Sequence, residues 1–121
     1  MDDRLKILLV DDDAGIRETM KDALAWKNIN VITACNGYDA IEFASKNDFD
    51  LALIDLRMPG IDGIETFKRI KVIKPAFKAF LVTAFADDVQ EKEATKAGIS
   101  GVFYKPVDVT HLIAVLVKYM H

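Results

Sequence analysis

The chain has 121 residues, of which 51% are hydrophobic and 29% charged, and its formal net charge is −3. This length suits one domain, and the apolar fraction excludes a disordered chain. The weakly acidic balance argues against direct nucleic-acid binding, and no stretch approaches the roughly 18 apolar residues of a membrane span. The single cysteine, Cys35, excludes an internal disulfide. We therefore expect one cytoplasmic domain over residues 1–121, without membrane contact.

Short apolar runs alternate along the chain with longer amphipathic segments. The runs predict strands because they are brief and bounded by turn residues, and the segments predict helices because their apolar residues recur every three or four positions. In chain order we expect a strand over 5–10, a helix over 14–26, a strand over 30–34, a helix over 37–45, a strand over 51–55, a helix over about 64–73, a strand over 78–83, a helix over 87–97, a strand over 101–104 and a helix over 110–119.

Helix ends carry their own signals. Asp13, Asn36 and Asp108 stand just before predicted helices, where a side-chain oxygen can accept from an unpaired backbone N–H. Gly98 follows the fourth predicted helix and is expected to end it.

Five strands alternating with five helices predict an α/β fold, a doubly wound parallel sheet built by right-handed crossovers. The strands are continuously apolar, which is typical of a sheet covered on both faces. In such sheets, ligands bind outside the carboxyl ends of the strands.

Reactive side chains gather at these carboxyl ends. Asp11 and Asp12 follow the first strand, Asp55 closes the third, Thr83 closes the fourth and Lys105 follows the fifth. Each residue alone has an ordinary explanation as a cap, a turn residue or a solvated charge. Their convergence on one rim of the sheet predicts a functional site.

The chemistry of this rim points to a metal ion and a phosphoryl group. Converging carboxylates repel one another, and Mg²⁺ prefers a few such oxygen ligands with some positions left open. Asp11, Asp12 and Asp55 therefore predict a magnesium site. Lys105 can pair with a phosphate oxygen and Thr83 can donate to another. A carboxylate can also act as the nucleophile in phosphoryl transfer, and Asp55 is the candidate.

Four motifs occur in the order and context of a known family. They are L-L-V-D-D-D at 8–13, L-I-D-L-R-M-P-G-I-D-G at 53–63, L-V-T-A at 81–84 and Y-K-P at 104–106. The chain thereby resembles, from about residue 6 to 119, the receiver domain of bacterial two-component response regulators. The resemblance implies a flavodoxin-like fold with strand order 2-1-3-4-5.

The resemblance also implies how the phosphoryl group is handled. Asp55 would be the phosphoacceptor, taking the group from a histidine kinase or a histidine phosphotransferase. Thr83 would move toward the phosphoryl group and Lys105 would pair with it. The peptide bond between Lys105 and Pro106 would be cis. The domain would act as a signalling switch, catalysing only its own phosphorylation and slow dephosphorylation.

The metal ligands and the output surface are implied in the same way. Asp12 would ligate Mg²⁺ directly, Asp11 would help to hold the ion, and the backbone carbonyl of Arg57 would supply a further ligand. Phosphorylation would switch the surface of the fourth helix, fifth strand and fifth helix for a downstream protein. The apolar surplus of the last helix leaves open a homodimer on phosphorylation or simply a well-buried helix.

Two features depart from the pattern of the family. The aromatic residue expected three positions before Lys105 is replaced by Val102, and we hypothesise that Tyr104 substitutes for it. Arg57 and Phe85 occupy the positions two after Asp55 and two after Thr83. Both are bulky, and we expect them to hinder the attacking water and prolong the phosphorylated state.

Other residues receive structural interpretations. Cys35 and Trp26 are expected to be structural, and the cationic stretch over 68–74 is expected to be a solvated helix face. Two alternative functions stay open. A haloacid-type phosphatase needs a second aspartate two residues after its nucleophile. Two residues after Asp55 stands Arg57, which does not meet this need. Two residues after Asp11 stands Asp13, which does. A binding module independent of phosphorylation would need a decayed site. The chain could also be part of a longer regulator.

Overall fold

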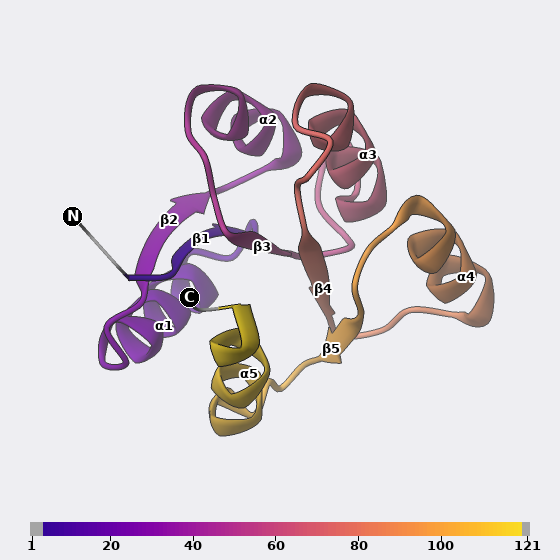
Figure 1. Ribbon diagram of the computed structural model, residues 1–121. Helices are drawn as coiled ribbons and strands as arrows, with labels where there is room; N and C mark the ends of the chain where they lie inside the picture. The colour runs from indigo at the N-terminus through magenta and orange to yellow at the C-terminus, as the bar shows by residue number, and fades with distance from the viewer. Residues whose placement is uncertain (1–3, 120–121) are drawn as a thin grey trace.

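The computed structural model describes residues 4–119, in which five parallel strands form one sheet with helices on both faces (Figure 1). The elements are β1 (Lys6–Val10), α1 (Ala14–Ala25), β2 (Asn30–Ala34), α2 (Gly37–Lys46), β3 (Leu51–Ile54), α3 (Gly63–Ile73), β4 (Ala79–Thr83), α4 (Asp88–Ala97), β5 (Val102–Tyr104) and α5 (Val109–Leu116), with a 3₁₀ turn at Val117–Tyr119. The strand order is β2-β1-β3-β4-β5, which confirms the predicted fold.

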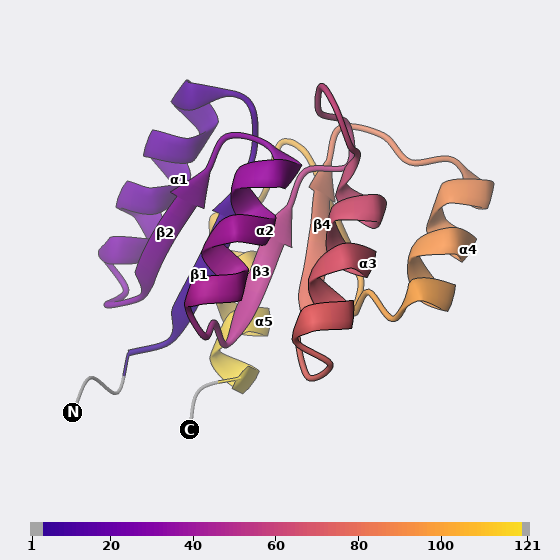
Figure 2. The same ribbon diagram turned by 90° about the horizontal axis from the view of Figure 1, so that it is seen from above.

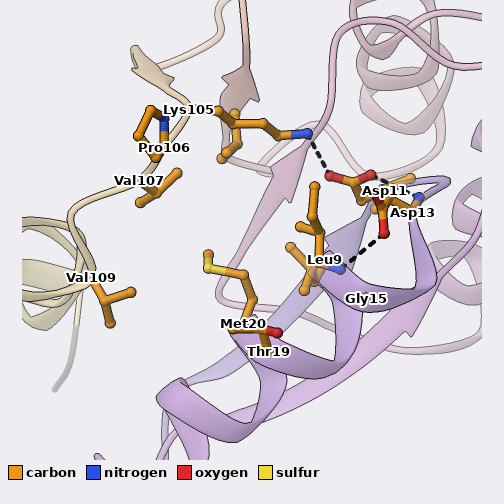
Figure 3. A pocket seen from close by; sticks show the side chains of 13 residues that line it. Leu9, Asp11, Asp13, Gly15, Thr19, Met20, Lys105, Pro106, Val107 and Val109 are labelled. Atoms are coloured by element: carbon orange, nitrogen blue, oxygen red, sulfur yellow. Dashed lines mark hydrogen bonds and ion pairs between the residues drawn. The ribbon is translucent and has the colours of Figure 1, made fainter.

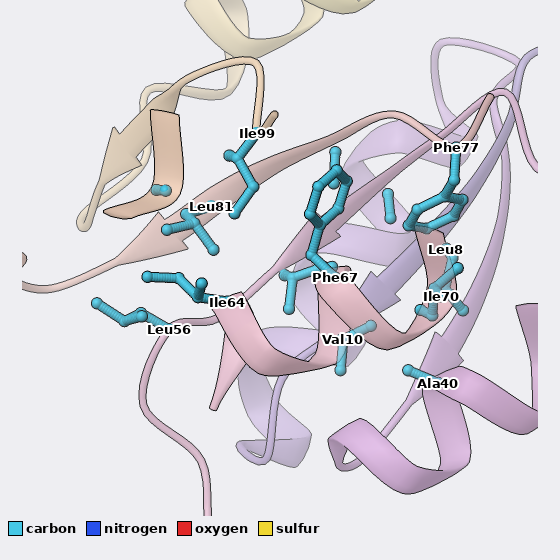
Figure 4. Close-up of a cluster of buried hydrophobic side chains, with 14 of the residues drawn as sticks. Leu8, Val10, Ala40, Leu56, Ile64, Phe67, Ile70, Phe77, Leu81 and Ile99 are labelled. Atoms are coloured by element: carbon cyan, nitrogen blue, oxygen red, sulfur yellow. The ribbon is translucent and has the colours of Figure 1, made fainter. Parts of the chain in front are cut away.

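The two faces of the sheet bury separate sets of side chains. From above, α2 and α3 cover one face while α5 lies behind the sheet (Figure 2). In β1, Leu8 and Val10 join the cluster beneath α2, α3 and α4, whereas Ile7 and Leu9 join the cluster beneath α1 and α5. Figure 4 shows the first cluster, centred on Phe67 of α3. Burial on both faces explains why the strands are apolar at consecutive positions.

The predicted helix caps are confirmed. The side chains of Asp13, Asn36 and Asp108 each accept from a backbone N–H three residues on. Gly98 ends α4 in the left-handed region at φ 100°, where glycine avoids the Cβ clash. Element ends agree with the prediction to within about one residue, except that the last helix is regular only to Leu116.

Two residues expected to be structural lie at the surface. Trp26 is 89% exposed and Cys35 is also exposed, so neither belongs to the core. The solvated face of α3 is confirmed, since Lys68 and Arg69 form exposed ion pairs. In α5, Leu112 and Leu116 are buried. Met120 and His121, which the sequence places beyond the last helix, lie outside the described residues.

No helix within residues 4–119 has the length and apolar character needed to cross a membrane.

The start of α3 packs directly against the end of β3. A Cβ on Gly63 would lie 2.4 Å from the backbone oxygen of Asp55, and the Gly63 N–H donates to the Leu56 carbonyl at 2.8 Å. We expect Gly63→Ala to lower the free energy of unfolding by about 1–3 kcal/mol, because backbone must move to admit the methyl group. Urea denaturation followed by circular dichroism measures this. Gly15→Ala, in the first turn of α1, is the control; equal losses in both variants would contradict the prediction.

Candidate functional site

The register of the sheet brings the predicted site residues to one rim. Val10 of β1 pairs with Ile54 of β3, and the Asp55 N–H donates to the Val10 carbonyl at 2.8 Å. Asp11 and Asp55 therefore leave neighbouring strands side by side. On the other side of the site, the Lys105 N–H donates to the Thr83 carbonyl at 2.8 Å. Four strand ends thus deliver their functional groups to the same place.

Three carboxylates converge at this rim. Asp11, Asp12 and Asp55 each offer an oxygen, and these oxygens lie within 4.8 Å of one another. Asp11 is 2% exposed and Asp55 is 7% exposed, whereas Asp12 faces solvent. Hard oxygen ligands in a partly open cluster fit a divalent cation such as Mg²⁺, which keeps several waters when protein supplies few carboxylates. The residues present thus fit the predicted metal.

Lys105 closes the site on the side of β5. Its Nζ lies 2.8 Å from Oδ2 of Asp11 and 3.3 Å from Oδ2 of Asp55, and Figure 3 shows the side chain reaching toward Asp11. Burial alone would lower the pKa of Lys105, but the hydrogen bond to Asp11 and the charges of Asp11 and Asp55 outweigh it and raise that pKa. The ammonium therefore stays protonated at neutral pH.

Asp55 lies in an unfavourable setting for a charge. Burial, followed by the negative charge of Asp11, raises the pKa of the Asp55 carboxyl, while Lys105 and a backbone hydrogen bond to Arg57 oppose the shift. A buried carboxylate with incomplete compensation gains from any cation that binds beside it. This setting favours a bound metal ion.

Thr83 is buried, and its hydroxyl is turned toward the backbone of Phe85 and not toward the carboxylates. Among the described residues, its hydroxyl pairs with the backbone carbonyl and N–H of Phe85, at 3.2 and 3.4 Å. The residue thus lies at the rim as predicted, with its hydroxyl turned toward the loop that leads to α4.

Three further predictions concern residues next to the carboxylate cluster. The bond between Lys105 and Pro106 is cis, as expected. Arg57 is exposed, and the role of its carbonyl as a metal ligand stays a prediction. The Asp13 carboxylate accepts from the Ile16 N–H at 3.2 Å, which is the capping role predicted from the sequence.

Two contacts at the site were not predicted. Arg17 of α1 donates from Nη1 to the Asp11 carbonyl at 2.8 Å and so fixes the turn that carries the acidic pair. The Arg57 guanidinium lies 5.7 Å from the centre of the Phe85 ring. No spacing in the sequence signals either contact, because each joins separate segments through flexible side chains.

Comparison with known proteins agrees with this geometry. The family model described as the response regulator receiver domain matches residues 7–117. The chain belongs to this family. It is thus a receiver domain of two-component response regulators, a class of phosphoacceptor signalling domains, and the phosphatase alternative is set aside.

Individual relatives show how widely this receiver domain is shared. It is 34% identical to sporulation initiation phosphotransferase F of Bacillus subtilis, covering 95% of this chain and 93% of that protein. It is 37% identical to the transcriptional regulatory protein ZraR of Salmonella typhimurium, but spans only 26% of that protein's length. The chemotaxis protein CheY4 of Vibrio cholerae has a similar structure, with a TM-score of 0.90 and 26% identity over 97% of this chain and 99% of that chain.

Proposed function

We propose that this receiver domain is a phosphorylation switch in which Asp55 accepts a phosphoryl group from a histidine kinase or a histidine phosphotransferase. The convergence of Asp11, Asp12 and Asp55 beside the Lys105 ammonium carries this proposal. Asp11, Asp12, Asp55 and the backbone carbonyl of Arg57 would hold Mg²⁺. The bound ion would neutralise charge on the transferring oxygens.

The proposed reaction is an in-line displacement at phosphorus. An oxygen of Asp55 attacks the phosphorus, the bond from phosphorus to the donor imidazole nitrogen breaks, and that nitrogen keeps the electron pair. Asp55 becomes an acyl phosphate. Lys105, already 3.3 Å from Asp55, pairs with the new phosphoryl oxygens, and Thr83 can turn its hydroxyl toward them. Hydrolysis of the acyl phosphate restores the carboxylate and resets the switch.

A groove beside the site suits the protein that donates the group. It has a volume of about 660 Å³ and lies between α1 and the segment from Lys105 to Val109 (Figure 3). Its lining includes the apolar side chains of Leu9, Met20 and Val107 and the charged residues Asp11 and Lys105. An amphipathic helix carrying the phosphohistidine fits such an apolar groove.

The output would pass through α4, β5 and α5 to a downstream protein in the cytoplasm. The phosphoryl group adds up to about two negative charges and three acceptor oxygens at Asp55. Such a change shifts the population between two arrangements of the neighbouring elements. The proposal includes a single domain over residues 1–121. It also includes a homodimer that forms on phosphorylation, which a measurement of mass in solution would detect.

Intact mass after incubation with acetyl phosphate and Mg²⁺ tests the proposed function. We expect one added phosphoryl group on the natural chain and none on Asp55→Asn or without the metal. Asp48→Asn, which changes an exposed aspartate between α2 and β3, should be modified like the natural chain. A folded, magnesium-loaded protein that gains no mass would instead indicate a binding module independent of phosphorylation.

The pair formed by Arg57 and Phe85 is expected to prolong the phosphorylated state. Their side chains stack between the loops after β3 and β4, where they can screen the acyl phosphate from water. Because such an exposed pair holds its geometry by only about 0.5–1 kcal/mol, we expect Arg57→Ala or Phe85→Ala to speed hydrolysis roughly two- to fivefold. Decay of the phosphorylated mass with time measures this.

Trp26→Ala is the control for removing an exposed aromatic ring, since Trp26 follows α1 at the opposite end of the sheet. Loss of the phosphoryl group from the natural chain within seconds would contradict a protective role for the pair.

A further inference from the structure

A hydrogen bond between side chains ties α4 to the end of β5. The Tyr104 hydroxyl donates to the carboxylate of Glu91. Tyr104 is the last residue of β5, and Glu91 lies in the first turn of α4. The hydrogen bond to Glu91, together with partial desolvation and the charges of Glu91 and Asp88, raises the pKa of the Tyr104 phenol. The phenol therefore remains a donor at physiological pH.

The helix that this bond restrains is weakly anchored elsewhere. Among the ten residues of α4, only Ala94 is buried. The ion pair from Glu93 to Lys68 of α3 is half exposed on both sides, and exposed pairs of this kind contribute little. An element with so few buried contacts can shift at low cost. The hydrogen bond to β5 is thus one of the contacts that hold the start of α4.

The same hydrogen bond joins β5 to the helix that follows the Thr83 loop, and this loop would move on phosphorylation. Thr83 and Tyr104 are register partners on β4 and β5. After Thr83, the chain runs through Phe85, whose backbone pairs with the Thr83 hydroxyl, to Asp87, which caps α4 in a capping box. One end of this short loop is held by Thr83 and the other end is α4 itself. Any turn of Thr83 toward Asp55 releases the loop from its present partner.

We propose that the hydrogen bond from Tyr104 to Glu91 is a latch that holds α4 in the unphosphorylated arrangement. The latch opens when Thr83 leaves Phe85 for a phosphoryl group, because β5 stays in the sheet while the start of α4 moves with the loop. Val102, at the position where the family pattern has an aromatic residue, can form no such polar tie. Opening leaves the Tyr104 hydroxyl and the Glu91 carboxylate unpaired at the surface, where a downstream protein can bind them. This inference rests on the proposed function.

The latch predicts that removing the hydrogen bond tightens the binding of a phosphoryl mimic. Beryllium trifluoride binds a carboxylate together with Mg²⁺ and mimics a tetrahedral phosphoryl group. If the latch stabilises only the unphosphorylated arrangement, removing it lowers the cost of the change that the mimic requires. We expect Tyr104→Phe and Glu91→Ala each to bind the mimic roughly two- to tenfold more tightly, the range that one hydrogen bond supplies. The double variant should gain no more than the better single variant.

Isothermal titration with beryllium fluoride and Mg²⁺ measures these affinities, and circular dichroism confirms that each variant is folded. Glu42→Ala is the control, because Glu42 is a glutamate on α2 that pairs with Lys46 in an exposed ion pair; its affinity should equal that of the natural chain. Unchanged or weaker binding in both single variants overturns the latch and indicates a structural contact present in both states. Failure of the natural chain itself to bind the mimic overturns the proposed function instead.

Discussion

Replacing Lys105 with methionine is expected to slow phosphorylation of Asp55 about a hundredfold, the loss typical of removing one fixed donor from developing charge. The Lys105 ammonium lies within 3.3 Å of an Asp55 oxygen and within 2.8 Å of an Asp11 oxygen. It is therefore already placed for the phosphoryl oxygens before the reaction begins. Methionine keeps the length and apolar stem of the side chain but removes the charge.

The same substitution is expected to tighten Mg²⁺ binding. Lys105 competes with a cation for the carboxylates of Asp11 and Asp55, so removing the ammonium leaves their charge for the metal. A variant that binds the metal better and reacts more slowly separates the role of Lys105 in transfer from a general loss of structure. Simple misfolding would weaken both properties.

The rate of mass gain with acetyl phosphate and a calorimetric Mg²⁺ titration provide the two measurements. Lys46→Met is the matched control, since Lys46 forms only an exposed ion pair on α2, and it should behave as the natural chain. Lys105→Arg keeps the charge and should lose less than Lys105→Met. Equal phosphorylation rates for Lys105→Met and the natural chain would refute the role of Lys105.

The rim of the sheet was predictable because parallel strands impose it. Once five strands were recognised, the residues following each had to emerge at one edge, whatever the details of packing. Asp11, Asp55, Thr83 and Lys105 lie there for this reason. The observed register pairs Val10 with Ile54, directly before Asp11 and Asp55, and the Lys105 N–H donates to the Thr83 carbonyl. The caps were predictable for a similar reason, since each is a contact within three residues.

Surface contacts between separate segments could not be predicted in this way. The stacking of Arg57 on Phe85 and the bond from Tyr104 to Glu91 depend on rotamers and on loop positions. Such contacts contribute about 1 kcal/mol or less and leave no periodic pattern in the sequence. The exposure of Trp26 could not be predicted either, because folded surfaces carry many apolar atoms.

Replacing Asp55 with asparagine is expected to stabilise the metal-free protein at neutral pH. Burial and the charge of Asp11 raise the pKa of Asp55 in the folded state. A carboxyl with a raised folded pKa contributes stability below its ordinary pKa, and this contribution is lost as the pH rises through the folded value. At neutral pH the folded state therefore carries the cost of a buried, repelled charge. We expect a gain on the order of 1 kcal/mol, the usual size of a single-substitution effect. Lys105 keeps its ion pair with Asp11 in the variant, so no charge is left unpaired.

Urea denaturation at neutral pH, at acid pH below the ordinary pKa of aspartate, and with added Mg²⁺ tests this expectation. The gain should be present at neutral pH, vanish in acid where Asp55 is protonated in both states, and shrink when Mg²⁺ stabilises the natural chain but not the variant. Asp48→Asn should lower the free energy of unfolding at neutral pH. The hydrogen bond with Lys74 and the Lys74 charge lower the pKa of the Asp48 carboxyl. The stability that the Asp48 carboxylate contributes to the fold is present above the ordinary pKa of aspartate and is lost as the pH falls through its lowered pKa. If Asp55→Asn destabilised the metal-free protein at neutral pH, the Asp55 carboxylate would be a net stabilising partner of Lys105, and a site organised around uncompensated negative charge would be ruled out.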